Sequence, residues 1–242
     1  MRILIIRHAD PDYSIDSLTE TGWKEAQALT KRLEKLDMSA FYVSPMGRAQ
    51  DTASFILKKE QAEAEIHPWL REFGHRLQKP YEDHLTVPWD WLPDIWTKEK
   101  HYYDLDHWSD TELFHEAQLP EQYQWVTEGL DSILARHGYV REESYYRVEQ
   151  ANEETIVFFC HFGLECVLIS HLLHISPMQL WHGVCAAPSS VTTLVTEERR
   201  KGVAQFRMIA FGDTSHLYAE GMEPSFSARF CETYDHHDQR HD

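Results

Sequence analysis

The stretch Ile3-Leu4-Ile5-Ile6-Arg7-His8, near the start of the chain, decides the fold. Its short continuous apolar run predicts a strand that is buried on both faces of a parallel sheet. Arg7 and His8 follow at the carboxyl end of that strand, and ligands of open α/β sheets bind beyond the carboxyl ends of the strands. A guanidinium and an imidazole at this position predict a site for a small anion.

Outward from this strand, predicted strands and helices alternate along the chain. Helices are expected over residues 19–36 (with Thr19 as N-cap), 47–58, 121–137 and 163–173. Further strands are expected over residues 40–43, near 66, over 155–160, and in a late hairpin of residues 191–196 and 203–211. The alternation predicts an α/β fold, a three-layer α/β/α sandwich with a mostly parallel sheet. We predict one domain over residues 1–242, with an irregular, Trp-, Tyr- and acid-rich insertion at about residues 74–119.

Charge and composition restrict the class of partner. The formal net charge is −17 over 242 residues, which argues against nucleic acid or an anionic membrane surface as a partner. No run approaches the roughly 18 apolar residues of a membrane-spanning helix, and the apolar start is too short for a signal peptide. The four cysteines lack metal-ligand spacing and are interpreted as reduced thiols. We therefore expect a cytoplasmic protein.

Two later strand ends carry side chains of the same kind. Arg48 lies in the first turn of the helix that follows Ser44-Pro45, where the helix dipole and the guanidinium both favour an anion. His161 ends the strand over residues 155–160 and begins the next helix. Taken alone, Arg48 could be a solvated helix cap and His161 an ordinary strand-end histidine. Because all three positions lie at the ligand-binding edge of the sheet, we expect them to converge on one crevice.

Five motifs in this order resemble those of the histidine phosphatase superfamily, in its phosphoglycerate-mutase-like branch, over nearly the whole sequence. The R-H-G motif matches Arg7-His8-Ala9, and the L-T-x-x-G-x-x-[QE]-A helix matches Leu18–Ala26. The S-P-x-x-R-A-x-x-T-A segment matches Ser44–Ala53 at every specified position. L-x-E matches Leu70–Glu72, and a strand ending in H-G-G matches His161–Gly163. The resemblance implies a phosphoglycerate-mutase-like fold.

The resemblance also implies a mechanism. His8 would be the nucleophile and would form a phosphohistidine. Arg7, Arg48 and His161 would bind the non-bridging phosphate oxygens and neutralise their charge. Glu72 would protonate the leaving alcohol and then deprotonate the attacking water. This chemistry needs no cofactor and no metal, because the arginines and histidines supply the positive charge.

Three positions depart from the family pattern. Ala9 replaces the motif glycine, which would tighten the pocket if that position required a positive φ. Phe162 replaces the middle glycine after His161, so its amide is expected to contact phosphate while its side chain points away. Ser14 stands where many relatives carry a phosphate-binding asparagine, and its hydroxyl is expected to donate to phosphate.

The leading hypothesis is a phosphatase that hydrolyses a small phosphorylated metabolite. The first alternative is a phosphoglycerate mutase, but the family's mutases have a longer loop between the R-H-G and L-T motifs and a basic insertion. Here only the nine residues Ala9–Ser17 separate His8 from Leu18, and the later insertion is acidic. The second alternative is a non-catalytic binding protein of the same fold. For the insertion, two interpretations stay open: its aromatic rings form a small core of their own, or it caps the crevice. The sequence makes no prediction of the oligomeric state.

Overall fold

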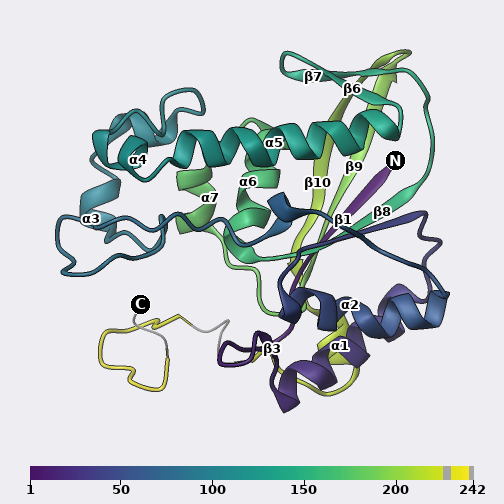
Figure 1. Ribbon diagram of the computed structural model, residues 1–242, viewed down its shortest axis with the longest axis horizontal. Coiled ribbons are helices and arrows are strands. Elements are labelled where there is room, and N and C mark those ends of the chain that lie inside the picture. Colours follow the sequence, from purple (N-terminus) through teal and green to yellow (C-terminus); the bar gives the residue numbers. More distant parts are fainter. Residues whose placement is uncertain (226–229, 240–242) are drawn as a thin grey trace.

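A computed structural model describes residues 1–225 and 230–239 of the chain (Figure 1). Its central feature is a sheet of eight strands. Their spatial order is β5 (Glu65–Ile66), β4 (Ala40–Val43), β8 (Thr155–Cys160), β1 (Arg2–Arg7), β9 (Val191–Arg200), β10 (Val203–Asp213), β7 (Tyr145–Val148) and β6 (Tyr139–Glu142). A two-stranded ribbon follows β1 and consists of β2 (Pro11–Asp12) and β3 (Ser17–Leu18).

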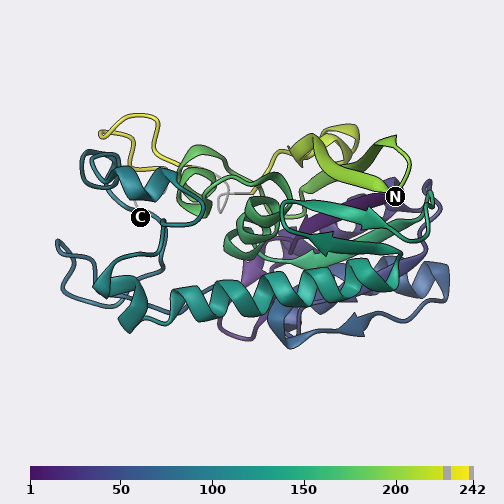
Figure 2. The ribbon, with the colours of Figure 1, turned by 90° about the horizontal axis from the view of Figure 1, so that it is seen from above.

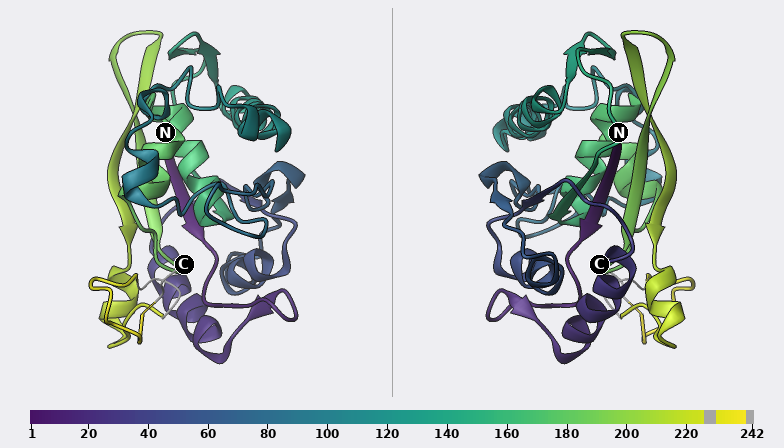
Figure 3. Two further views of the ribbon diagram at one scale, coloured as in Figure 1. Left: turned by 90° about the vertical axis from the view of Figure 1, so that its left-hand side faces the viewer. Right: turned by 90° about the vertical axis from the view of Figure 1, so that its right-hand side faces the viewer.

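The helices lie on the two faces of this sheet and in the insertion. The α-helices are α1 (Glu20–Leu33), α2 (Gly47–Glu60), α3 (Pro93–Trp96), α4 (Glu112–Glu116), α5 (Leu119–Arg136), α6 (Phe162–Leu173), α7 (Pro177–Gly183) and α8 (Ser215–Ala219). Two short 3₁₀ helices are η1 (Pro68–Leu70) and η2 (Lys100–Tyr103). Figures 1 and 2 place the insertion at the end of the molecule opposite the N-terminus. In Figure 3, α1 and α2 lie together in the lower part of the molecule and α5 in the upper part.

The parallel half of the sheet brings the predicted strand ends to one edge. β5, β4, β8 and β1 are parallel neighbours, with Arg7 opposite Cys160 and Val43 opposite Phe159. The chain therefore leaves β1, β4 and β8 at the same edge. The predicted α/β sandwich is confirmed. The sheet is mixed, because β9, β10, β7 and β6 pair antiparallel beyond β1.

Each face of β1 belongs to a different apolar layer, as expected of a strand covered on both sides. Ile3 and Ile5 join the cluster that includes residues of α5 and α6, whereas Leu4 and Ile6 join the cluster formed with α1 and α2. All four side chains are at most 2% exposed. The uninterrupted apolar run is thus explained by burial on both faces.

One hairpin was not foreseen from the sequence. β6 and β7 form an antiparallel pair at the sheet edge, although polar residues alternate unevenly through this stretch. Tyr146 is its buried anchor, and its ring contacts Phe206 of β10 edge to face at 5.1 Å between centroids. Tyr139 of β6 also meets Phe206, at 6.3 Å between centroids, so long-range aromatic contacts help to hold a segment whose own pattern is weak.

The insertion packs into the main core. Its buried rings Trp89, Trp91 and Trp108 share one apolar cluster with residues of α5 and α6, and Trp108 meets Trp181 of α7 at 5.6 Å. The rings therefore do not form a separate core. No helix within residues 1–225 and 230–239 combines the length and the apolar character that crossing a membrane would require.

Candidate active site

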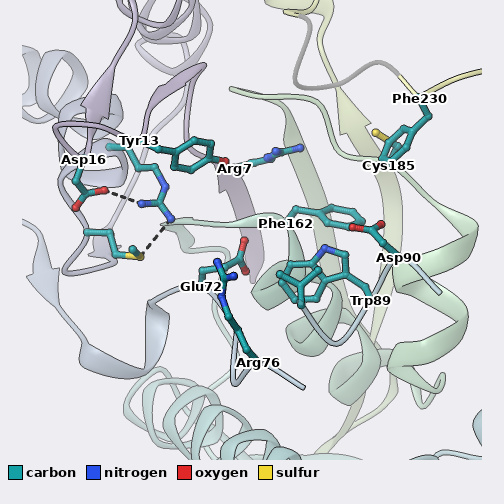
Figure 4. Close-up of a pocket in the computed structure, with 13 residues that line it drawn as sticks. Arg7, Tyr13, Asp16, Glu72, Arg76, Trp89, Asp90, Phe162, Cys185 and Phe230 are labelled. Atoms are coloured by element: carbon teal, nitrogen blue, oxygen red, sulfur yellow. Dashed lines mark hydrogen bonds and ion pairs between the residues drawn. The ribbon is translucent and has the colours of Figure 1, made fainter. Parts of the chain in front are cut away.

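A cavity of about 970 Å³ opens at the carboxyl edge of the parallel strands (Figure 4). It draws its walls from the loops after β1 and β4, from the start of α6 and from the insertion. The lining residues are Arg7, Tyr13, Asp16, Met46, Arg48, Glu72, Arg76, Val87, Trp89, Asp90, Phe162, Cys185 and Phe230. The predicted residues Arg7, Arg48, Glu72 and Phe162 are thus brought together, with His8 and His161 buried beside them.

His8 is held as a neutral imidazole with one free lone pair. It is 2% exposed, and its Nδ1–H donates to the carbonyl of Ala9 at 2.8 Å, because a carbonyl can only accept. Burial, followed by the charges of Arg7 and Arg48, lowers the pKa of His8 well below its usual value. Nε2 is therefore unprotonated, which is the state that a nucleophile requires.

His161 lies against His8, with 5.1 Å between the ring centroids. Its Nε2 forms a hydrogen bond of 2.8 Å with the hydroxyl of Ser44, so two strand ends fix this ring. Burial is the largest of the causes that lower the pKa of His161 well below its usual value, and His8 and the arginines add to it. The sequence predicted that the arginines and the two histidines together supply the positive charge, but in the structure only the arginines carry it.

Both arginines are anchored by contacts with other parts of the chain. Arg7 Nη1 donates to the carbonyl of Ala186 at 2.6 Å, and Arg48 Nη1 pairs with Asp16 at 2.6 Å. Asp16 also accepts from the amide of Gly47. A Cβ at Gly47 would lie 2.2 Å from the carbonyl oxygen of Asp16, so only glycine allows this close approach.

Several nitrogen donors in this site are buried and have no hydrogen-bond partner among the described residues. They are Arg7 Nε, Arg48 Nε and, in the tautomer whose Nε2 accepts from the Ser44 hydroxyl, His161 Nδ1. Leaving a buried donor unsatisfied costs about 1–3 kcal/mol. Donors of this kind beside one cavity match the oxygens of a tetrahedral oxyanion, which offers several acceptors at once.

Glu72 has the surroundings of an acid that works near neutral pH. Its Oε1 accepts from the amides of Phe73 at 2.9 Å and Leu164 at 3.0 Å, which leaves Oε2 to carry the proton. Burial raises the pKa of Glu72 to about 7, against the opposing effects of Leu164 and Arg7. Gly163 makes room for this arrangement, since a Cβ there would lie 2.3 Å from the Trp89 ring and 3.0 Å from Glu72 Oε1.

The three departures from the family pattern have different outcomes. Ala9 is buried and does not have a positive φ, so its backbone conformation requires no glycine. The Phe162 side chain was expected to point away, and this was wrong. It lines the cavity, and the Arg7 guanidinium lies over its ring at 5.8 Å from the ring centroid. Ser14 is not brought into the cavity, because its hydroxyl donates to Asp12 in the exposed loop.

Other residues of the site were missed from the sequence. Asp16 orients Arg48, and Ser44 orients His161. Thr52 ties the first strand to α2, accepting from the amide of Ala9 and donating to the carbonyl of Arg48. Ser44 and Thr52 are specified positions of the S-P-x-x-R-A-x-x-T-A motif, which was the available signal, whereas no pattern singled out Asp16.

A buried carboxyl next to the site, Glu165 on α6, leads to a prediction about stability. The Glu165 side chain is fully buried, and this burial raises its pKa to about 8, although a hydrogen bond from Thr192 and the charge of Arg7 oppose the rise. Between the unfolded pKa of 4.5 and about 8, the folded state holds a proton that the unfolded state releases. Wild-type stability should therefore fall with rising pH through this range.

Glu165→Gln removes this titration. In urea unfolding, the free energy of unfolding of the variant relative to that of wild type should increase between about pH 5 and about pH 8, by on the order of a few kcal/mol. Glu128→Gln, on the exposed face of α5, is the matched control and should show no such trend. A stability difference between Glu165→Gln and wild type that is independent of pH would contradict the assignment.

Within residues 1–225 and 230–239, no group of three or more His, Cys, Asp or Glu side chains is placed to hold a metal ion. Cys160 and Cys166 are buried thiols beside this site, and none of the four cysteines forms a disulfide within the described residues.

Comparison with known proteins agrees with this geometry. The family model of the histidine phosphatase superfamily (branch 1) matches residues 3–208. A probable phosphatase of Schizosaccharomyces pombe is 25% identical over 236 residues, which cover 91% of this chain and 97% of that protein. Adenosylcobalamin/alpha-ribazole phosphatase of Escherichia coli is 25% identical over 201 residues, which cover 75% of this chain and 84% of that protein.

Solved structures share the fold. Phosphoserine phosphatase from Entamoeba histolytica, in complex with phosphoserine, superposes with a TM-score of 0.60 at 18% identity and covers 89% of this chain and 98% of that one. Mycobacterial glucosyl-3-phosphoglycerate phosphatase gives a TM-score of 0.58 at 16% identity, covering 87% and 98%. At these identities the likeness concerns the fold alone.

Proposed function

The chain belongs to branch 1 of the histidine phosphatase superfamily, and from this premise we propose that it hydrolyses a small phosphomonoester through a phosphohistidine on His8. The observation that best supports this function is the set of buried, unpartnered donors on Arg7, Arg48 and His161 around a neutral His8. Donors that have no partner in the folded chain are satisfied when phosphate binds, which supports phosphate as the ligand.

In the first step, His8 Nε2 attacks phosphorus and the bond from phosphorus to the ester oxygen breaks. Glu72 transfers its proton to the departing oxygen, so that an alcohol leaves rather than an alkoxide. Arg7, Arg48 and His161 stabilise the charge on the three non-bridging oxygens. The phosphohistidine then remains in the cavity with Glu72 ionised.

In the second step, the Glu72 carboxylate takes a proton from water while the water oxygen attacks phosphorus. The bond between phosphorus and His8 Nε2 breaks, inorganic phosphate leaves, and both residues return to their starting protonation states. Glu72 with a pKa of about 7 suits both roles, because its two protonation states have similar free energies at neutral pH. Ser14, whose hydroxyl donates to Asp12 outside the cavity, is not among the phosphate ligands.

Residues 1–242 act as one domain, in which the insertion supplies the cavity wall formed by Arg76, Val87, Trp89 and Asp90. The partner is a small phosphorylated metabolite that acts as substrate, and the protein works in the cytoplasm.

The fate of the phosphate tests this function against a mutase. Purified protein in EDTA should release inorganic phosphate from at least one member of a panel of phosphorylated metabolites. With 3-phosphoglycerate and catalytic 2,3-bisphosphoglycerate it should form no appreciable 2-phosphoglycerate, because water reaches the phosphohistidine. The products are measured by phosphate assay and by phosphorus NMR. Rapid isomerisation without net phosphate release would establish the mutase instead.

A further inference from the structure

A tight turn between α7 and β9 contacts the two residues that begin the active site. The carbonyl of Ala186 accepts from Arg7 Nη1 at 2.6 Å. The carbonyl of Ser190 accepts from the Arg7 amide at 3.3 Å, and the amide of Ser189 donates to the carbonyl of His8 at 3.1 Å. The turn therefore fixes the position of Arg7 and His8, although residues 186–190 are not among those that line the cavity.

This turn has a backbone conformation that its residues do not favour. The amide of Ser190 donates to the carbonyl of Ala187 at 3.0 Å, so Pro188 and Ser189 are the central residues of a β-turn. Ser189 has a φ of +59°, and a positive φ at this position is that of a type II turn, which favours glycine there. Serine has a Cβ and adopts this left-handed region only at a cost in free energy. Strained backbone beside an active site points to a function for the residue that is strained.

The side chain of Ser189 explains why a serine stands at this position. Its hydroxyl forms a hydrogen bond of 3.1 Å with Nε2 of His216, the second residue of α8. Ser189 is fully buried and His216 is 4% exposed. Burial, followed by the charge of Arg32, lowers the pKa of His216 to about 4, so its ring is neutral at neutral pH. Glycine would form the same turn without strain, but it would offer no side chain for His216 to hold.

The contact between Ser189 and His216 is a poor way to gain stability. Ser189 is strained, and His216 Nδ1 is buried without a hydrogen-bond partner among the described residues, which is itself unfavourable. The segment that leads into α8 is already tied to α1, because Arg32 Nη2 pairs with Asp213 at 2.8 Å. The contact is therefore better explained by what it positions than by the docking of α8.

We propose that His216 is a positioning residue for phosphoryl transfer and that it acts through Ser189. By holding the Ser189 hydroxyl, His216 fixes the turn, and the turn keeps the Ser189 amide on the carbonyl of His8. The amide of His8 is held separately, by the carbonyl of Cys160 at 2.9 Å. With both backbone groups of His8 fixed, its Nε2 stays in line with the bond that breaks, and loss of such alignment slows the reaction. The inference rests on the proposed function and deepens it with residues outside the cavity.

The test measures the attack by His8 separately from the binding of phosphate. Enzyme in excess is mixed with p-nitrophenyl phosphate, and release of p-nitrophenol in a single turnover reports the attack. His216→Ala should be slower by about 10- to 100-fold, the effect of a misplaced reacting group. Its affinity for inorganic phosphate, from calorimetric titration, should change by less than about threefold, because Arg7 and Arg48 keep their contacts. His216→Gln should recover part of the rate, since its amide can bond the hydroxyl.

Variants of Ser189 distinguish positioning from the docking of α8. Ser189→Ala keeps the strained backbone and loses the hydroxyl, so it should be slowed like His216→Ala. Ser189→Gly should be slowed less, because glycine takes a positive φ without strain. Adding Ser189→Gly to His216→Ala should therefore recover about tenfold of the lost rate. Comparing Ser189→Ala with Ser189→Gly makes the same test with α8 intact, should His216→Ala fail to fold.

His171→Ala is the matched control, because it removes a histidine that is hydrogen-bonded to Asp131 from the last turn of α6. It should leave the single-turnover rate unchanged. A loss in His216→Ala that Ser189→Gly does not recover would assign the contact to the docking of α8 and overturn the inference. A wild-type rate in His216→Ala would overturn it too, as would a phosphate affinity that falls as much as the rate.

Failure of the underlying function gives a different result. If wild type formed neither p-nitrophenol nor a phosphohistidine, the proposed function would be wrong and the inference would fall with it. If wild type forms both and His216→Ala is equally fast, only the positioning role of His216 is wrong.

Discussion

His8→Ala abolishes hydrolysis of the preferred phosphomonoester, with an expected loss in kcat on the order of 10⁴-fold or more. The variant lacks the nitrogen that attacks phosphorus, and no other unprotonated nucleophile in the described site replaces it, since the Cys160 thiol is buried with a pKa well above its usual value. Arg7, Arg48 and Glu72 remain, so binding of inorganic phosphate should persist. Steady-state kinetics and calorimetric titration with phosphate measure the two properties separately.

The covalent intermediate gives a direct readout of the same assignment. Wild type that is mixed rapidly with substrate and quenched in alkali should carry a phosphoryl group on the peptide containing His8, as detected by mass spectrometry, because phosphohistidine survives base and not acid. His107→Ala, which removes an exposed histidine paired with Asp110, is the matched control and should be fully active. Wild-type activity in His8→Ala would exclude the mechanism.

Glu72→Gln separates substrates by their leaving groups. An alkyl phosphate needs its departing oxygen protonated, whereas p-nitrophenolate leaves unaided. We therefore expect kcat/KM on an alkyl monoester to fall by about 10²–10⁴-fold, and kcat/KM on p-nitrophenyl phosphate by less than about tenfold. Glutamine keeps the acceptor for the amides of Phe73 and Leu164, so the local structure should be retained.

Because Glu72 also acts as the general base for water, its replacement should cause the phosphohistidine form of the enzyme to accumulate. In Glu72→Gln, p-nitrophenyl phosphate should still phosphorylate His8, but no base is left to activate water. A burst of p-nitrophenol followed by slow turnover should appear, with phosphohistidine as the main enzyme form. Glu63→Gln, at an exposed position of the same chain segment, should behave like wild type. Equal losses on both substrates, without a burst, would show that Glu72 is not the acid.

The pKa of Glu72 sets the pH dependence of the acid step. Because the protonated form is required and the pKa is raised to about 7, the acid is present below this pH and is lost above it. The ratio of wild-type kcat/KM on the alkyl ester to that on p-nitrophenyl phosphate should therefore fall about tenfold per pH unit above neutrality. Taking the ratio removes the titration of the phosphate group, which both substrates share.

The fold was largely readable from the sequence because its strongest signals are local. The run Ile3–Ile6 and the strand Thr155–Cys160 are apolar throughout because both faces of each strand are buried, and Thr19 caps α1 as predicted by accepting from the amide of Gly22. The β6–β7 hairpin could not be read in this way. Its stability depends on Tyr146 meeting Phe206, about sixty positions away in the chain.

Some features of the candidate site likewise follow from the sequence, whereas others depend on the tertiary structure. By itself, the sequence determined which residues stand at the strand ends: Arg7, His8, Arg48 and His161 follow parallel strands, and parallel strands end at one edge. Only the tertiary structure decided their chemical states and neighbours. Burial is the main reason that His8 is neutral and the pKa of Glu72 is about 7, and burial is a property of everything packed around a group. Chain folding likewise brought Asp16 to Arg48 and placed Arg76 in the cavity wall, because these contacts depend on loop paths that no local pattern specifies.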